Sequence, residues 1–171
     1  SNDIKNLITQ LDLEDVVLIA HSMSTLIAQK TALIDSRISK LILITPIPPT
    51  GIKLSQIAKD KLIDEMKENK NKIEEIVYSA SKRHNKTWAK SRIKMAYESS
   101  ILNARIGYMK MYLETDFSQE VENIKIPIKI IVGKYDFPIF ALKSVTKLFF
   151  PYYKGTSSTL INTTLKDLRG E

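Results

Sequence analysis

The sequence has no cysteine, which excludes disulfide bonds and thiolate metal sites and fits a reducing compartment, so we expect a cytoplasmic protein. No apolar run reaches the roughly 18 to 20 residues of a membrane-spanning helix, and the N-terminus lacks the basic-then-apolar pattern of a secretory signal. The sequence also lacks a glycine-rich phosphate loop and a metal-ligand cluster, so we predict no cofactor and no metal. The sequence has only two histidines, His21 and His84.

The 171 residues, 43% of them apolar, are enough to enclose a hydrophobic core. Helical spacing of apolar residues predicts a helix over residues 3–11, and an apolar β-branched run predicts a strand over 16–20. A second helix over 23–33 and a second buried strand over 40–45 follow. This strand–helix–strand order predicts a right-handed crossover between parallel strands, and hence an α/β fold.

The rest of the chain changes character twice. Residues 54–113 carry a long, charged pattern with helical spacing, and two further apolar runs predict strands over 128–133 and 159–161. We therefore expect three segments: an α/β core over 1–51, a helical cap over 52–115 and returning core strands over 116–171.

The junction between the first strand and the second helix carries the clearest chemical signal. Ser22 sits at this junction, with the small residues Ala20 and Ser24 two positions before and after it. A sharp strand-to-helix turn that lifts a serine hydroxyl clear of a sheet needs small residues at these two places. Compared with a glycine at this place, Ser24 adds side-chain atoms where the strand and the helix approach closely. Taken alone, Ser22 also fits an ordinary serine cap at the start of a helix.

The ordered segments resemble the second half of the α/β-hydrolase family, from about residue 3 to residue 164. Ala20-His21-Ser22-Met23-Ser24 stands in the place of the family's G-x-S-x-G, and Ile124-Lys125-Ile126-Pro127 leads to Gly133-Lys134-Tyr135-Asp136. The resemblance implies a partial α/β-hydrolase fold and an esterase-like serine hydrolase that acts on a small acyl substrate. It also implies that Ser22 is the nucleophile, that Asp136 is the acid, and that the Met23 N–H belongs to the oxyanion hole.

The resemblance places the catalytic base after the last strand, where this chain has Asn162-Thr163-Thr164 and no histidine. We expect His21 to point toward the packed side of the turn and His84 to lie on an exposed part of the cap. Neither is then in the expected place for the base. The second oxyanion donor would come from an N-terminal segment that this chain does not contain. We therefore expect impaired hydrolysis, and the alternative is a truncated or degenerate hydrolase that acts as a binding module.

The strand over 16–20 would normally pair on both sides in this family. Without a preceding strand, one of its edges is expected to be bare, and a bare apolar edge invites pairing with another chain. We expect association with a missing N-terminal segment, self-association, or a truncated remnant.

Most of the net charge of +7 lies in the cap, where residues 52–115 hold 14 Lys and Arg against 8 Asp and Glu, a difference of +6. A basic run with Trp88 inside it is compatible with contact to nucleic acid or to an anionic surface. We favour a solvated helix face, because no nucleic-acid-binding motif accompanies the charge.

Overall fold

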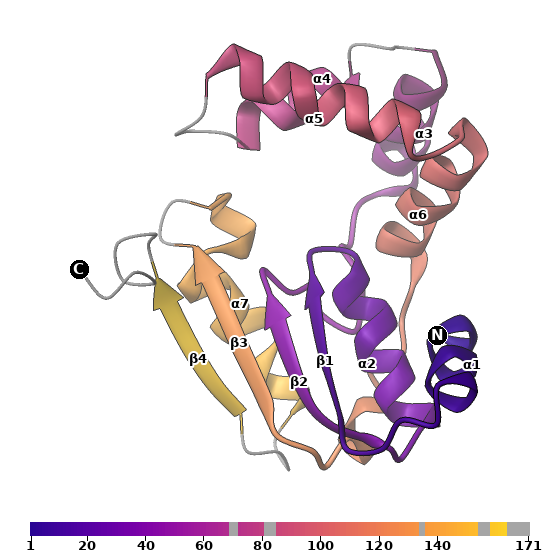
Figure 1. Ribbon diagram of the computed structural model, residues 1–171. Helices are drawn as coiled ribbons and strands as arrows, with labels where there is room; N and C mark the ends of the chain where they lie inside the picture. Colours follow the sequence, from indigo (N-terminus) through magenta and orange to yellow (C-terminus); the bar gives the residue numbers. More distant parts are fainter. Residues whose placement is uncertain (69–71, 81–84, 134–135, 154–157, 164–171) are drawn as a thin grey trace. The chain divides into compact units, whose positions relative to one another are not determined.

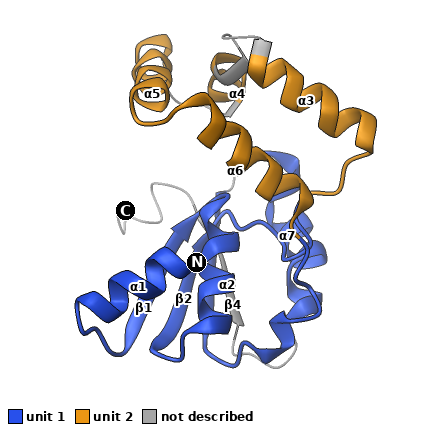
Figure 2. Cartoon of the chain, turned by 90° about the vertical axis from the view of Figure 1, so that its right-hand side faces the viewer, with its two compact units in different colours: residues 1–51, 116–171 blue, residues 52–115 orange. Residues whose placement is uncertain are grey.

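The computed structural model describes residues 1–68, 72–80, 85–133, 136–153 and 158–163 (Figure 1). The chain divides into two compact units (Figure 2). Unit 1 contains residues 1–51 and 116–171, and unit 2 contains residues 52–115. In the described part of the chain, no helix has the length and apolar character needed to cross a membrane.

Unit 1 is built on a parallel sheet, as the sequence predicts. Its four strands lie in the order β1-β2-β3-β4, and each neighbouring pair is parallel (Figure 1). The strands are β1 (Val16–His21), β2 (Ile38–Ile44), β3 (Ile128–Gly133) and β4 (Ser158–Thr163). Because β1 ends this order, it is an edge strand among the described residues.

The helices of unit 1 are α1 (Asn2–Gln10), α2 (Ser24–Ile34) and α7 (Leu142–Leu148). The described residues of unit 1 also form short 3₁₀ turns over Val121–Asn123, Pro138–Phe140 and Phe150–Tyr152. Helix α2 packs against β1 and β2 (Figure 1). This arrangement is the crossover that the first half of the sequence predicts.

Successive side chains of a strand point to opposite faces, and the two faces of this sheet differ in burial. On one face, Leu41, Leu43 and Ile130 are completely buried and form the centre of the core. On the other face, the edge strand leaves Val17 45% and Ile19 66% exposed. The sheet is therefore well packed on one side, and its first strand is uncovered on the other.

The described part of unit 2 contains the helices α3 (Gln56–Glu68), α4 (Lys72–Ala80), α5 (Lys86–Glu98) and α6 (Leu102–Glu114). Helix α3 packs against α6, and α4 packs against α5. Asn85 caps α5 by accepting a hydrogen bond of 3.0 Å from the Trp88 N–H.

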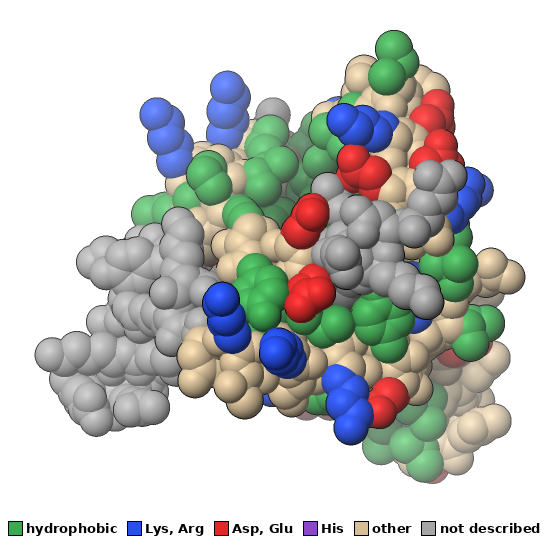
Figure 3. Space-filling view, turned by 90° about the horizontal axis from the view of Figure 1, so that it is seen from above, with side chains coloured by type: hydrophobic (Ala, Val, Ile, Leu, Met, Phe, Trp, Pro, Cys, Tyr) green, Lys and Arg blue, Asp and Glu red, His purple; other side chains and the backbone are tan. Residues whose placement is uncertain are grey.

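Part of the basic run of unit 2 makes contacts within its own helix. The Arg92 guanidinium lies 5.4 Å from the centre of the Trp88 ring, and Lys94 lies 3.6 Å from the Glu98 carboxylate. On the face of the molecule seen in Figure 3, basic side chains are interspersed with acidic and hydrophobic ones.

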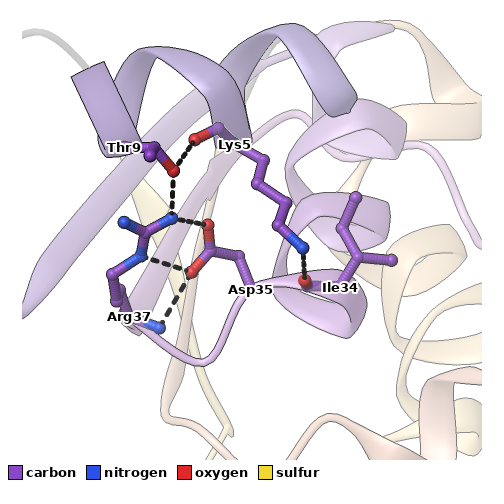
Figure 4. A network of polar contacts seen from close by, with 5 residues as sticks. All are labelled: Lys5, Thr9, Ile34, Asp35 and Arg37. Atoms are coloured by element: carbon purple, nitrogen blue, oxygen red, sulfur yellow. Dashed lines mark hydrogen bonds and ion pairs between the residues drawn. The ribbon is translucent and has the colours of Figure 1, made fainter.

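One polar network ties the start of β2 to the two N-terminal helices (Figure 4). Arg37 donates to both carboxylate oxygens of Asp35, at 2.9 Å from Nε and 2.7 Å from Nη2, and its Nη2 also donates to Thr9 Oγ1 at 2.8 Å. Lys5 Nζ donates to the Ile34 carbonyl oxygen at 3.2 Å. The side-chain hydrogen bonds from Arg37 lower the pKa of Asp35 from 3.8 to about 2.

We predict that Asp35→Asn destabilises unit 1 at neutral pH and that this difference from the parent shrinks in acid. A carboxylate with a depressed folded-state pKa stabilises the fold above its unfolded value of 3.8, and this contribution is lost as the pH falls toward about 2. Urea unfolding of both proteins at several values between pH 6 and pH 2 measures the difference. Glu122→Gln, at an exposed carboxylate, is the control. A pH-independent difference would contradict the prediction.

Candidate active site

The backbone of Ser22 adopts a left-handed conformation, with φ at 54°. This conformation is uncommon for a residue with a side chain and costs on the order of 1 to 2 kcal/mol. Ser22 directly follows β1, and helix α2 begins two residues later at Ser24. The left-handed residue thus makes the sharp strand-to-helix turn for which the small neighbours are needed.

Hydrogen bonds on both sides hold this turn. The Ser22 N–H donates to the Ile44 carbonyl oxygen of β2 at 3.0 Å, which extends the sheet by one bond. The Ser22 carbonyl oxygen accepts from the N–H of Thr25 at 3.0 Å and from its hydroxyl at 2.6 Å. All these bonds engage the Ser22 backbone, so the turn is fixed without using the serine hydroxyl.

Ser24 takes part in the turn through its hydroxyl. The His21 N–H donates to Ser24 Oγ at 3.0 Å, and the Ser24 hydroxyl donates to the His21 carbonyl oxygen at 2.7 Å. The extra atoms that serine brings to the place of the second glycine are therefore accommodated, because they satisfy two backbone groups at the end of β1.

Met23 stands at the N-terminus of α2, with φ at −56° and ψ at −32°. Its carbonyl oxygen accepts from the Leu26 N–H at 3.2 Å. Among the described residues, no acceptor is bonded to the Met23 N–H. The first N–H groups of a helix are free to bind an anion, and the helix dipole favours negative charge there.

Two buried polar side chains of α2 fix the loop that follows β2. Thr25 Oγ1 accepts from the Ile47 N–H at 3.0 Å, and Gln29 Nε2 donates to the Ile47 carbonyl oxygen at 3.1 Å. Gln29 also accepts from the Tyr153 hydroxyl, and burial raises the pKa of that hydroxyl. Tyr153 stacks on Phe149 with ring centres 4.5 Å apart. The loop after β2 is therefore held against the same helix that begins at the Ser22 turn.

Thr45 directly follows β2 and also has a left-handed backbone, with φ at 50°, as do Asp12 and Asp15 before β1. Its N–H donates to the Ile131 carbonyl oxygen at 2.8 Å, and its hydroxyl donates to Asp136 Oδ2 at 2.9 Å. The Phe137 N–H donates to the other oxygen, Asp136 Oδ1, at 2.8 Å. Both oxygens of the half-buried Asp136 are thus bound, and the orientation of the carboxylate is fixed.

Ser22, Thr45 and Asp136 follow the carboxyl ends of three successive strands. His21 pairs with Ile44 in the register of β1 and β2, so Ser22 and Thr45 are neighbours just beyond this pair. Strands lie about 4.8 Å apart, so the ends of β1 and β3 are separated by about 10 Å. The carboxyl end of a parallel sheet is the usual place for a ligand in an open α/β fold.

The prediction for His21 is wrong. The sequence places its side chain on the packed side of the turn, but His21 is exposed. The reason is that His21 shares the uncovered face of the edge strand with Val17 and Ile19. His84 and Thr164 lie outside the described residues, and Thr163 ends β4. In the ranges that the structure describes, no three metal-ligating side chains come together.

The sequence alone does not point to Thr45. A threonine at the end of a strand carries no motif, and its bond to Asp136 joins residues 91 positions apart. Thr45 could be identified from its position beside Ser22 at the ends of neighbouring strands. That position is known only when the register of the sheet is known.

No protein-family model matches the sequence, and a search of curated proteins gives no match. Solved structures do match. The chain is similar to an esterase from Exiguobacterium antarcticum, with a TM-score of 0.80 and 20% identity over 98% of this chain and 67% of that one. It is similar to a bromoperoxidase from Bacillus anthracis, with a TM-score of 0.79 and 18% identity over 94% and 63%.

A third similar structure is MGS-M2, an α/β hydrolase from a deep-sea metagenome library, with a TM-score of 0.66 and 18% identity. Its match covers 94% of this chain and 62% of that one. The chain thus has part of the α/β-hydrolase fold, and it spans about two thirds of the length of these structures.

We predict that Thr45→Val lowers the free energy of unfolding by about 1 to 2 kcal/mol, because it removes a hydrogen bond to a carboxylate and preserves the side-chain shape. Thr45→Ser keeps the hydroxyl and is the matched control. Urea unfolding of both variants, alone and combined with Asp136→Asn, measures the coupling between the two residues. Equal losses in the valine and serine variants would show that the hydroxyl contributes nothing.

Proposed function

We propose that this chain is part of an esterase-like serine hydrolase with Ser22 as its nucleophile and a small acyl compound as its substrate. The observation that carries the proposal is the left-handed backbone of Ser22 at a strand-to-helix turn. The fold shared with the esterase from Exiguobacterium antarcticum supports the same reaction class.

Each residue has a defined role in this proposal. Ser22 Oγ attacks the carbonyl carbon of the substrate while a base takes the hydroxyl proton, and the carbonyl oxygen becomes an oxyanion. The Met23 N–H, at the positive end of α2, stabilises that oxyanion. Asp136 orients the base, and its own orientation is fixed by Thr45 and the Phe137 N–H.

The proposal includes impaired activity. The family places a histidine base where this chain has Thr163 and Thr164. Loss of the base costs on the order of 1,000-fold or more in turnover. A base supplied from outside the chain would then raise the reactivity of Ser22.

Labelling with a fluorophosphonate, read by intact mass, tests this proposal. We predict slow labelling of the parent, no labelling of Ser22→Ala, and at least tenfold faster Ser22-dependent labelling when free imidazole is added as a base. Ser91→Ala, at an exposed serine of α5, is the matched control and should label like the parent.

Labelling that persists in Ser22→Ala would contradict the assignment of the nucleophile. A folded parent that stays unlabelled with and without imidazole would contradict the hydrolase role. That result would favour the second candidate function.

The second candidate is a binding or interaction module. The observation that favours it is the position of β1, which is an edge strand among the described residues and exposes Val17 and Ile19. Exposed apolar strand edges can pair with another polypeptide. This role needs neither a base nor a complete oxyanion hole.

A further inference from the structure

The Thr25 hydroxyl connects two segments of unit 1 that are distant in the sequence. It donates to the Ser22 carbonyl oxygen at 2.6 Å and accepts from the Ile47 N–H at 3.0 Å. A hydroxyl has one hydrogen to donate and can accept at the same time, so one side chain makes both bonds. Thr25 and Ile47 are completely buried, which keeps solvent away from this connection. Thr25 therefore bridges the Ser22 turn and the loop that follows β2.

Thr31 provides a comparison within the same helix. It is also a completely buried threonine of α2, and its hydroxyl donates to the Ile27 carbonyl oxygen at 2.8 Å. Bonds of this kind to the preceding turn are common for threonine in helices. In the part of the chain that the structure describes, no group donates to the Thr31 hydroxyl. The bond from the Ile47 N–H to Thr25 is therefore an additional one, and it ties α2 to the loop.

The Ser22 turn holds the backbone on both sides of Thr45. On one side, the Ser22 N–H donates to the Ile44 carbonyl oxygen at 3.0 Å. On the other side, the Ser22 carbonyl oxygen is linked through Thr25 to the Ile47 N–H. Thr45 lies between these two anchors with φ at 50°. A positive φ is rare for a β-branched residue and persists only where the surrounding structure enforces it.

Thr45 in turn orients the carboxylate of Asp136. Its hydroxyl donates to Asp136 Oδ2 at 2.9 Å, so a shift of the Thr45 backbone lengthens or breaks this bond. A base that Asp136 orients must reach the Ser22 hydroxyl, and a misplacement of about 1 Å can cost on the order of 100-fold in rate. The spacing between the nucleophile and the acid therefore depends on how firmly Thr45 is held.

We propose that Thr25 is a positioning residue whose hydroxyl couples the backbone of Ser22 to Thr45. Through Thr45 it sets the position of Asp136 relative to Ser22. The effect of Thr25 on reactivity rests on the proposed hydrolase function, whereas the coupling is measurable without any reaction.

Amide hydrogen exchange of the full chain, followed by NMR, tests the coupling. We expect the Thr45 and Ile47 N–H groups to exchange about tenfold faster in Thr25→Val than in the parent, relative to the core N–H of Ile130. Valine keeps the shape of threonine and loses the hydroxyl. Thr25→Ser keeps the hydroxyl and should restore slow exchange. Thr31→Val is the matched control, because it removes a buried hydroxyl from the same helix without touching the loop.

Fluorophosphonate labelling in the presence of imidazole tests the effect on reactivity. The dependence of the labelling rate on probe concentration separates binding of the probe from the covalent step. We expect Thr25→Val to lower the maximal rate by about tenfold or more and to leave the half-saturating concentration unchanged. Thr25→Ser and Thr31→Val should label like the parent.

Circular dichroism and urea unfolding confirm that each variant is folded. If Thr25→Val does not fold, Thr25→Ala takes its place, because it removes the same hydroxyl without placing a methyl group against the Ser22 carbonyl oxygen.

Unchanged exchange at Thr45 and Ile47 in Thr25→Val would overturn the inference, even if the parent labels at Ser22. Equal changes in Thr25→Val and Thr31→Val would trace the effect to a general loss of stability and overturn it as well. Faster exchange in Thr25→Val alone, in a parent that never labels, would support the coupling and contradict the hydrolase proposal.

Discussion

The left-handed backbone at Ser22 is the constraint on which the candidate site depends. It reverses the direction of the chain within two residues, so that β1 ends and α2 starts without an intervening loop. The same turn places the Met23 N–H at the beginning of α2, where the helix dipole favours negative charge. A relaxed backbone at this residue would move the Ser22 hydroxyl and the N-terminus of α2 together.

Thr45 repeats this constraint on the neighbouring strand. Left-handed residues other than glycine store of order 1 to 3 kcal/mol of strain, and they persist where surrounding bonds hold them. At Ser22 and Thr45 these bonds run to the next strand of the sheet, at 3.0 Å and 2.8 Å. The loop after Thr45 is further held by Thr25 and Gln29 of α2. Two of the four left-handed non-glycine residues in the described part of the chain, Ser22 and Thr45, therefore lie at the end of the sheet that carries the candidate site, and the other two, Asp12 and Asp15, precede β1.

The architecture could be predicted from the sequence because its signals are local. The β-branched runs around residues 16–20, 40–45 and 128–133 predict buried parallel strands, and those strands are confirmed within two residues at each end. Small residues around Ser22 indicate the sharp turn for the same reason.

The features that the sequence does not predict depend on the register of the sheet and on which face of each strand is buried. The bond between Thr45 and Asp136 exists only because β2 and β3 are neighbours. The exposure of His21 follows from the edge position of β1, and local spacing does not report which face of an edge strand is covered. The role of the Ser24 hydroxyl likewise requires the geometry of the turn, because it accepts from and donates to the same residue.

The backbone of Ser22 is held in a left-handed conformation, and a comparison of Ser22→Gly with Ser22→Ala tests this most directly. Both variants lose the hydroxyl, but only alanine keeps the Cβ atom that disfavours a positive φ. The account predicts that urea unfolding gives the glycine variant a free energy of unfolding higher by about 1 kcal/mol. An alanine variant that is as stable as the glycine variant, or more stable, would contradict it.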